Sequence, residues 1–107
     1  MELYTKSRDG GVLYNATATY MDGTVVVKKG SKINRLNAPG FKPKKATASL
    51  RADDTLYEAG CFLKNDVSFK SLSTAATFVT GRIANGMIVW KTQDGKYVKY
   101  TLKQEGE

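Results

Sequence analysis

The sequence of 107 residues contains no histidine and a single cysteine. The lack of histidine removes the commonest general base and the commonest metal ligand. Cys61 cannot form a disulfide within the chain, and one cysteine without histidine does not make a zinc site. Because Cys61 is followed by Phe62 and Leu63, we expect it to be a small residue of the hydrophobic core. We expect no metal and no cofactor.

Long apolar runs are also missing. The sequence has no stretch of 18 or more apolar residues that could cross a membrane, and its N-terminus lacks the pattern of a secretory signal. We therefore expect a cytoplasmic location and no membrane partner. The composition, 41% hydrophobic and 25% charged, is typical of one globular domain spanning residues 1–107.

The usual catalytic combinations lack a partner residue. Ser71, Ser73 and Cys61 have no histidine to activate them, and Lys70 is next to Ser71 at a predicted strand-to-helix junction, where neighbours rarely face each other. The sequence contains neither of the common glycine-rich phosphate motifs. We expect that the protein is not an enzyme, and a small enzyme is the weakest of the interpretations considered.

Positive charge is what the sequence has in excess, and it is concentrated in one block. The net charge is +7, and residues 28–51 hold eight basic residues and no acidic one. The rest of the chain has nine basic and ten acidic residues, so the block accounts for the whole excess. Such a block is typical of proteins that bind the phosphate backbone of nucleic acids. A solvated loop that only aids solubility is the alternative.

The first half of the chain predicts strands. Residues 2–7 could form an edge strand, a turn is expected at Asp9-Gly10-Gly11, and residues 12–20 alternate between apolar and polar side chains. Met21-Asp22-Gly23 is typical of a hairpin leading to a strand at residues 24–28, whose three valines suggest burial on both faces. Residues 30–46 contain both prolines and predict a long, exposed and mobile basic loop.

A helix is expected next, at residues 50–59. Thr47 or Ser49 could cap it and Gly60 could end it, with Asp53 and Asp54 in its first turn, where the helix dipole favours acidic residues. A hairpin should follow, formed by residues 61–64 and 67–69. Near the C-terminus, residues 88–91 and 97–103 predict a last hairpin with Gln93-Asp94-Gly95 at its tip.

The clearest local pattern predicts a helix after Ser71, which is well placed as its N-cap. Gly81, or the pair Asn85-Gly86, supplies the positive φ that ends it. Residues 87–90 should then form a strand, with Trp90 in the core. The apolar stripe of the helix is formed by Leu72, Ala75, Ala76, Val79 and Ile83, and the other side carries Thr74, Thr77 and Thr80.

These elements give an α+β fold with about six mostly antiparallel strands in hairpins and two short helices. The start of the helix at Ser71 offers free N–H groups and an adjacent lysine, which is typical of anion sites. Arg82 could contact phosphate or offset the helix dipole. The candidate nucleic-acid-binding residues are therefore Lys28, Lys29, Lys32, Arg35, Lys42, Lys44, Lys45, Arg51, Lys70, Ser71, Ser73 and Arg82.

The second half of the chain resembles a known family. The motifs are Phe-Lys-Ser-Leu-Ser-Thr-Ala-Ala at residues 69–76, Gly-Arg-Ile-Ala-Asn-Gly at 81–86 and Trp-Lys at 90–91. They resemble a small domain of unknown function that is often appended to the C-terminus of GIY-YIG nucleases and occurs in restriction-modification contexts. They are also similar to the RAMA domain of restriction systems and adenine methyltransferases.

The resemblance extends over about residues 16–97. The strand before Lys-Gly-Ser at residues 29–31 and the Gly-Cys-Phe-Leu at 60–63 match that family as well. Leu72 stands where the family has proline, Ile83 replaces serine, and Met87 replaces a tryptophan, so any role of that aromatic is lost here.

The resemblance implies an accessory module that contacts nucleic acid, which we expect to be DNA. In the family this module accompanies a nuclease domain that this chain lacks. It implies no catalytic residue. The alternative is a protein-interaction or assembly module, in which the basic loop meets an acidic protein partner or a sheet edge pairs with another chain.

Overall fold

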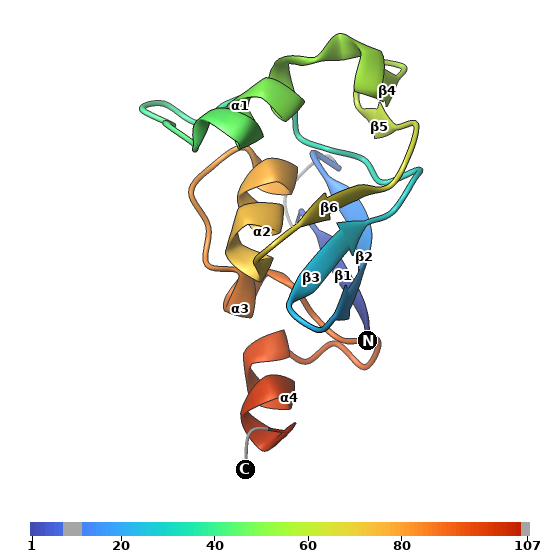
Figure 1. Ribbon diagram of the computed structural model, residues 1–107, viewed down its shortest axis with the longest axis vertical. Helices are drawn as coiled ribbons and strands as arrows, with labels where there is room; N and C mark the ends of the chain where they lie inside the picture. The colour runs from blue at the N-terminus through green and yellow to red at the C-terminus, as the bar shows by residue number, and fades with distance from the viewer. Residues whose placement is uncertain (8–11, 106–107) are drawn as a thin grey trace.

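The computed structural model describes residues 1–7 and 12–105. The turn expected at Asp9-Gly10-Gly11 lies outside these residues. A four-stranded antiparallel sheet has the order β1-β2-β3-β6, and a small second sheet pairs β4 with β5 (Figure 1). The strands are β1 (Glu2–Lys6), β2 (Asn15–Met21), β3 (Thr24–Val27), β4 (Tyr57–Glu58), β5 (Phe62–Leu63) and β6 (Val67–Phe69).

Helices cover one face of the larger sheet and extend beyond its lower end (Figure 1). They are α1 (Lys45–Ala52), α2 (Leu72–Thr80), α3 (Gly86–Val89) and α4 (Val98–Glu105), with a 3-10 turn η1 (Asp54–Leu56). The predicted α+β class is confirmed, and the described residues contain more helices than expected. No helix among them is long and apolar enough to cross a membrane.

The core lies between the sheet and α2. Alternate residues of β2, Ala16 and Ala18, and of β3, Val25 and Val27, are at most 1% exposed. They pack with α2 and with Trp90, which is fully buried and donates its indole N–H to the Leu72 carbonyl oxygen at 3.1 Å. The predicted strands and hairpin of residues 15–27 and the core position of Trp90 are confirmed, although Val26 of β3 is only half-buried.

Helix α2 begins after Ser71 and ends at Gly81, as predicted, but Ile83, expected on its apolar stripe, lies beyond the helix and is 67% exposed. The Ser71 hydroxyl accepts a hydrogen bond from the Thr74 N–H at 3.0 Å, and Gly81 adopts a left-handed conformation with φ of 78°. Thr77 and Thr80, on the side opposite the apolar stripe, are buried as well. The reason is that a second layer covers this side: residues 34–38 hydrogen-bond to the end of α2.

That second layer is part of the segment predicted to be an exposed loop. The expectation is wrong for Ser31 and Ile33, which are 4% and 1% exposed. Lys32 exchanges two backbone hydrogen bonds with Asn15, at 2.9 and 3.0 Å, so the segment runs along the sheet before crossing to α2. Side chains become mostly exposed only beyond Arg35.

The helix expected at residues 50–59 is shifted toward the N-terminus and is shorter. α1 ends at Ala52 because the Asp53 carboxylate accepts from the Thr55 N–H and caps the separate turn η1. Gly60 therefore does not end a helix; it lies in the turn between β4 and β5, with φ of 80°. Cys61, which follows it, is only half-buried.

The hairpin expected between residues 61–64 and 67–69 does not form. β5 pairs with β4, whereas β6 pairs with β3, with Val25 opposite Phe69. Asp66 explains the difference, because its carboxylate accepts from the Lys29 N–H at 2.8 Å and from the Lys28 amine at 3.1 Å. These two interactions lower the pKa of Asp66, with the Lys29 N–H contributing most.

Two expected strands near the C-terminus are helical. Residues 87–89 belong to α3, which Asn85 caps by accepting from the Met87 N–H at 3.0 Å. Asn85 has φ of −88°, so it does not take the left-handed conformation expected for it. The turn at Gln93-Asp94-Gly95 forms, with a bond from the Thr92 N–H to the Lys96 carbonyl, but the chain then enters α4.

Two arginines of the basic block hold the upper part of the molecule together. The Arg51 guanidinium is 5% exposed and donates to the Phe78 carbonyl at 2.6 Å and the Asn37 side-chain oxygen at 2.7 Å. The Arg35 guanidinium carbon lies 3.9 Å from the centre of the Tyr57 ring, and its Nη2 lies 2.7 Å from an Asp54 carboxylate oxygen. Desolvation lowers the pKa of Arg51, yet an arginine stays protonated in proteins.

The close approach of α3 to the start of α2 generates a prediction. A Cβ on Gly86 would overlap the Leu72 carbonyl group and lie 2.5 Å from the Ser73 nitrogen. Because these are backbone atoms that cannot rotate away, Gly86→Ala should lower the free energy of unfolding by about 1–3 kcal/mol or more. Urea denaturation followed by Trp90 fluorescence measures it.

Gly95→Ala is the control, because Gly95 has φ of 83° but open space where its Cβ would lie. Gly95→Ala should lower the free energy of unfolding by about 1–2 kcal/mol through backbone strain alone. Equal or greater destabilisation by Gly95→Ala would contradict the packing argument.

The buried fork of Arg51 generates a second prediction. Arg51→Lys keeps the charge but loses the planar guanidinium with its several donors, which leaves the Phe78 carbonyl of α2 or the Leu36 carbonyl of the loop before α1 without a partner. It should lower the free energy of unfolding by about 1–3 kcal/mol. Thermal and urea unfolding measure this, with the exposed Arg82→Lys as a control expected within about 0.5 kcal/mol of wild type. A variant with unchanged stability but weaker nucleic-acid binding would return Arg51 to the binding surface.

Candidate functional site

Several residues predicted to bind nucleic acid are engaged within the fold instead. Arg35 and Arg51 make the internal contacts described above, and Lys28 pairs with Asp66. At the start of α2, the hydroxyls of Ser71 and Ser73 accept from the N–H groups of Thr74 and Gly86. Their oxygens stabilise the junction between α2 and α3, while Lys70 beside them is exposed.

The lysines around the start of α1 have a different environment. Lys42, Lys44 and Lys45 are exposed, and no described carboxylate pairs with them. Lys29 is likewise exposed, whereas Lys32 is half-buried with its amine 6.0 Å from the centre of the Phe62 ring. We call Lys42, Lys44 and Lys45 the α1 lysines.

Arg82 lies next to the segment that carries the α1 lysines. It follows Gly81, whose carbonyl accepts from the Ala38 N–H at 2.9 Å, so the loop leading to α1 is tied to the turn after α2. Arg82 is exposed and lines a cavity. Its own carbonyl accepts from the Thr80 hydroxyl at 3.3 Å, which fixes the backbone of the turn.

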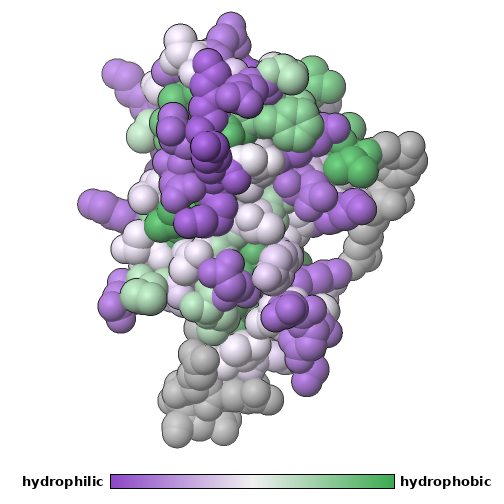
Figure 2. Space-filling model, turned by 90° about the vertical axis from the view of Figure 1, so that its right-hand side faces the viewer, coloured by the Kyte–Doolittle hydropathy of each residue, from purple (hydrophilic) through white to green (hydrophobic). Residues whose placement is uncertain are grey.

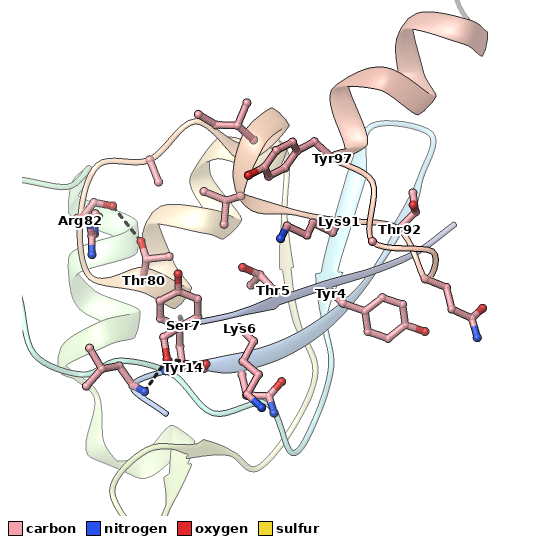
Figure 3. A pocket seen from close by; sticks show the side chains of 17 residues that line it. Tyr4, Thr5, Lys6, Ser7, Tyr14, Thr80, Arg82, Lys91, Thr92 and Tyr97 are labelled. Atoms are coloured by element: carbon pink, nitrogen blue, oxygen red, sulfur yellow. Dashed lines mark hydrogen bonds between the residues drawn. The ribbon is translucent and has the colours of Figure 1, made fainter. Parts of the chain in front are cut away.

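The cavity has a volume of about 880 Å³ and lies beside β1, between the turn after α2, helix α3 and the turn at residues 92–96 (Figure 3). Its lining combines three basic side chains, three tyrosines and several apolar residues, and contains no described carboxylate. The basic side chains are Lys6, Arg82 and Lys91, and the tyrosines are Tyr4, Tyr14 and Tyr97.

Lys91 is firmly placed in this cavity. Its backbone N–H and C=O both bond to Tyr4 of β1 at 2.8 Å, and Trp90 before it is fully buried. Its amine lies 5.2 Å from the centre of the Tyr97 ring. In Figure 3 the Lys91 amine is directed toward Thr5 and Tyr97, and Arg82 lies on the opposite side of the cavity.

Sequence reasoning missed Lys6, Lys91 and the role of the tyrosines. Lys6 and Lys91 lie outside the basic block, and they come together because Tyr4 and Lys91 form an isolated bridge between distant parts of the chain. One signal was present: Trp90-Lys91 is among the motifs of the resemblance, and a lysine next to a core tryptophan has its position fixed by the core.

The described side chains of the site are basic and aromatic rather than acidic. Among the described residues, no group of three or more histidine, cysteine, aspartate or glutamate side chains is placed to hold a metal ion. The lysine amines and the arginine can hold anions, while tyrosine rings and hydroxyls can stack and hydrogen-bond.

The surface around β4, β5 and the adjoining loops is mostly hydrophilic. Figure 2 shows hydrophilic side chains gathered over the upper part of this face, with scattered apolar residues between them. The apolar spots include Phe62, which is 39% exposed and packs near Lys32. Scattered apolar residues of this kind are normal on protein surfaces.

Comparison with known proteins gives one family. A family model described as a domain of unknown function, DUF4357, matches residues 6–102. Neither the curated proteins nor the solved structures give a significant match. The matched region contains strands β2 to β6, helices α1 to α3 and all three basic residues of the cavity, so the chain belongs to the DUF4357 family of domains of unknown function.

Proposed function

We propose that the domain binds nucleic acid without catalysis, by contacting the phosphate backbone, as an accessory to a DNA-processing or restriction-modification protein in the cytoplasm. One observation carries the proposal: the α1 lysines and Arg82 are exposed, have no described carboxylate partner, and belong to segments joined by the hydrogen bond between Ala38 and Gly81. Exposed cations that no carboxylate neutralises are what phosphate contacts require.

The fold divides the basic block into two groups. Lys28 and Arg35 form ion pairs with aspartates of the same chain, and Arg51 donates a hydrogen bond to the buried carbonyl group of Phe78. The α1 lysines remain, and their flanking sequence has no acidic residue between Lys28 and Arg51. We therefore place the backbone contacts on the α1 lysines and Arg82, with Lys29 and Lys70 as further exposed cations.

An acidic protein is the competing partner, because carboxylates and phosphates both attract unpaired lysines. The two differ in how binding responds to salt and to nuclease treatment. Binding to a nucleic acid releases condensed counterions, so log K falls linearly with log[salt] with a slope set by the number of phosphate contacts.

The test uses short labelled DNA duplexes, DNA single strands and RNA, with fluorescence anisotropy measured over a salt series starting at ~50 mM. The combined Lys44→Gln and Lys45→Gln variant should weaken binding and reduce the steepness of the salt dependence by about 1.5–2, since two phosphate contacts are lost. The matched control combines Lys64→Gln and Lys99→Gln, two exposed lysines elsewhere that lower the net charge equally.

Equal weakening by the two variants would mean that net charge alone matters and that the α1 lysines are no binding surface. Absence of binding to every nucleic acid at the lowest salt would overturn the proposed function. Capture of an acidic protein that survives nuclease treatment, without nucleic-acid binding, would favour the alternative.

A further inference from the structure

We infer that the cavity beside β1 binds one unstacked nucleotide, with Arg82 and Lys91, on opposite sides of the cavity, as contacts for its phosphate groups and with its base against the tyrosines. The inference rests on the proposed function, because binding of a nucleic-acid strand to the domain would bring such a nucleotide to the cavity. Phosphate contacts alone need only an exposed surface such as the α1 lysines. They do not explain a cavity of about 880 Å³, which lies within the roughly 300–1,000 Å³ of ligand sites.

The charge of the cavity selects an anion. Lys6, Arg82 and Lys91 come from β1, from the turn after α2 and from the segment after α3, so cations of three separate segments line the space. No described carboxylate lines it. Arg82 and Lys91 lie on opposite sides of the cavity in Figure 3, and each can hold a phosphate group by charge-assisted hydrogen bonds.

The remaining lining selects a ligand that also has a flat apolar part. Tyr14 and Tyr97 contribute rings, and Ile88 and Val89 of α3 contribute aliphatic side chains. A bare phosphate or sulfate ion would leave these surfaces unused. A nucleotide supplies both parts, since its base can stack on an aromatic ring while its phosphate reaches the cations.

The backbone of β1 offers hydrogen bonds as well. Tyr4 directs its N–H and C=O groups outward from the sheet, where they bond to Lys91. In a strand, these groups point to the same side at every second residue, so those of Lys6 face the same outer side. The bond from the Ser7 N–H to the Tyr14 carbonyl supports this alternation, because Ser7 points inward to β2. A donor and an acceptor side by side on an edge can pair with the edge of a base.

A base in a duplex cannot reach such a cavity, because it is stacked between its neighbours. The ligand is thus a nucleotide of a single strand, an extruded nucleotide, or a free mononucleotide. These sources share the same chemistry, and the experiment separates them.

The test is NMR titration of ¹⁵N-labelled protein with inorganic phosphate, dAMP, dCMP, a single-stranded DNA oligonucleotide and a duplex. We expect the single strand or the mononucleotides to shift the amides of Lys6, Arg82 and Lys91, and phosphate alone to shift them less. Lys91→Gln and Arg82→Gln should each weaken this binding by about tenfold, as expected for losing a charged hydrogen bond.

Lys99→Gln is the matched control, because the Lys99 amine also lies over a tyrosine ring, at 5.0 Å from the centre of Tyr100, but on α4 outside the cavity lining. It should bind as wild type. The ¹⁵N spectra of all three variants also report whether they fold like the wild type.

The outcomes separate the inference from the proposed function. Amide shifts on adding free mononucleotides would support the cavity site, with a free mononucleotide as its ligand. Shifts seen only with the single-stranded oligonucleotide would support the site with a nucleotide of a strand as its ligand. Nucleic-acid shifts confined to residues 42–45, with unchanged affinity in Lys91→Gln, would overturn the cavity and leave the proposed function standing. Equal shifts by phosphate and nucleotides would overturn the role of the base. Loss of all nucleic-acid binding would overturn both.

Discussion

The guanidinium group of Arg51 joins the segments on which the proposed binding surface depends. Its donors reach the Phe78 carbonyl near the end of α2, the Asn37 side chain and the Leu36 carbonyl, so α1, the loop before it and α2 meet at one buried cation. With α1 held in this way, Lys45 is carried on a helix whose position is fixed, and Lys44 lies at its N-cap. An arginine suits this place because its planar fork binds several acceptors at once while the charge is desolvated.

Local signals explain what could be predicted. Ser71 and Gly81 fix the ends of α2, and alternation fixes β2 and β3, because a cap or a pleat depends on neighbours in sequence. The partner of β6 could not be predicted, since Asp66 forms its bonds with Lys28 and Lys29, far away in the chain. Helix α3 was not predicted, because the apolar run at residues 87–90 has the pattern of a strand. The Asn85 cap and the close contact of Gly86 with the start of α2 make residues 86–89 helical instead.

The site shows the same limit. The excess of basic residues was visible in the sequence, but whether a basic side chain faces a carbonyl, a carboxylate or solvent is decided by tertiary structure. Arg35 and Arg51 therefore could not be told apart from Lys44 and Lys45 by composition. The cavity was invisible for the same reason, as its cations lie on three segments that only the folded chain brings together.

The bridge between Tyr4 and Lys91 has a consequence for how the domain can be divided. A peptide of residues 28–51 carries the whole excess of positive charge, so it keeps an attraction for any polyanion. It contains none of the residues that line the cavity, whose first and last basic residues, Lys6 and Lys91, are far apart in the chain. Their segments are joined by the two backbone hydrogen bonds between Tyr4 and Lys91 at the edge of the sheet. If the cavity binds a nucleotide as proposed, discrimination among anions, as distinct from attraction to them, requires the intact domain.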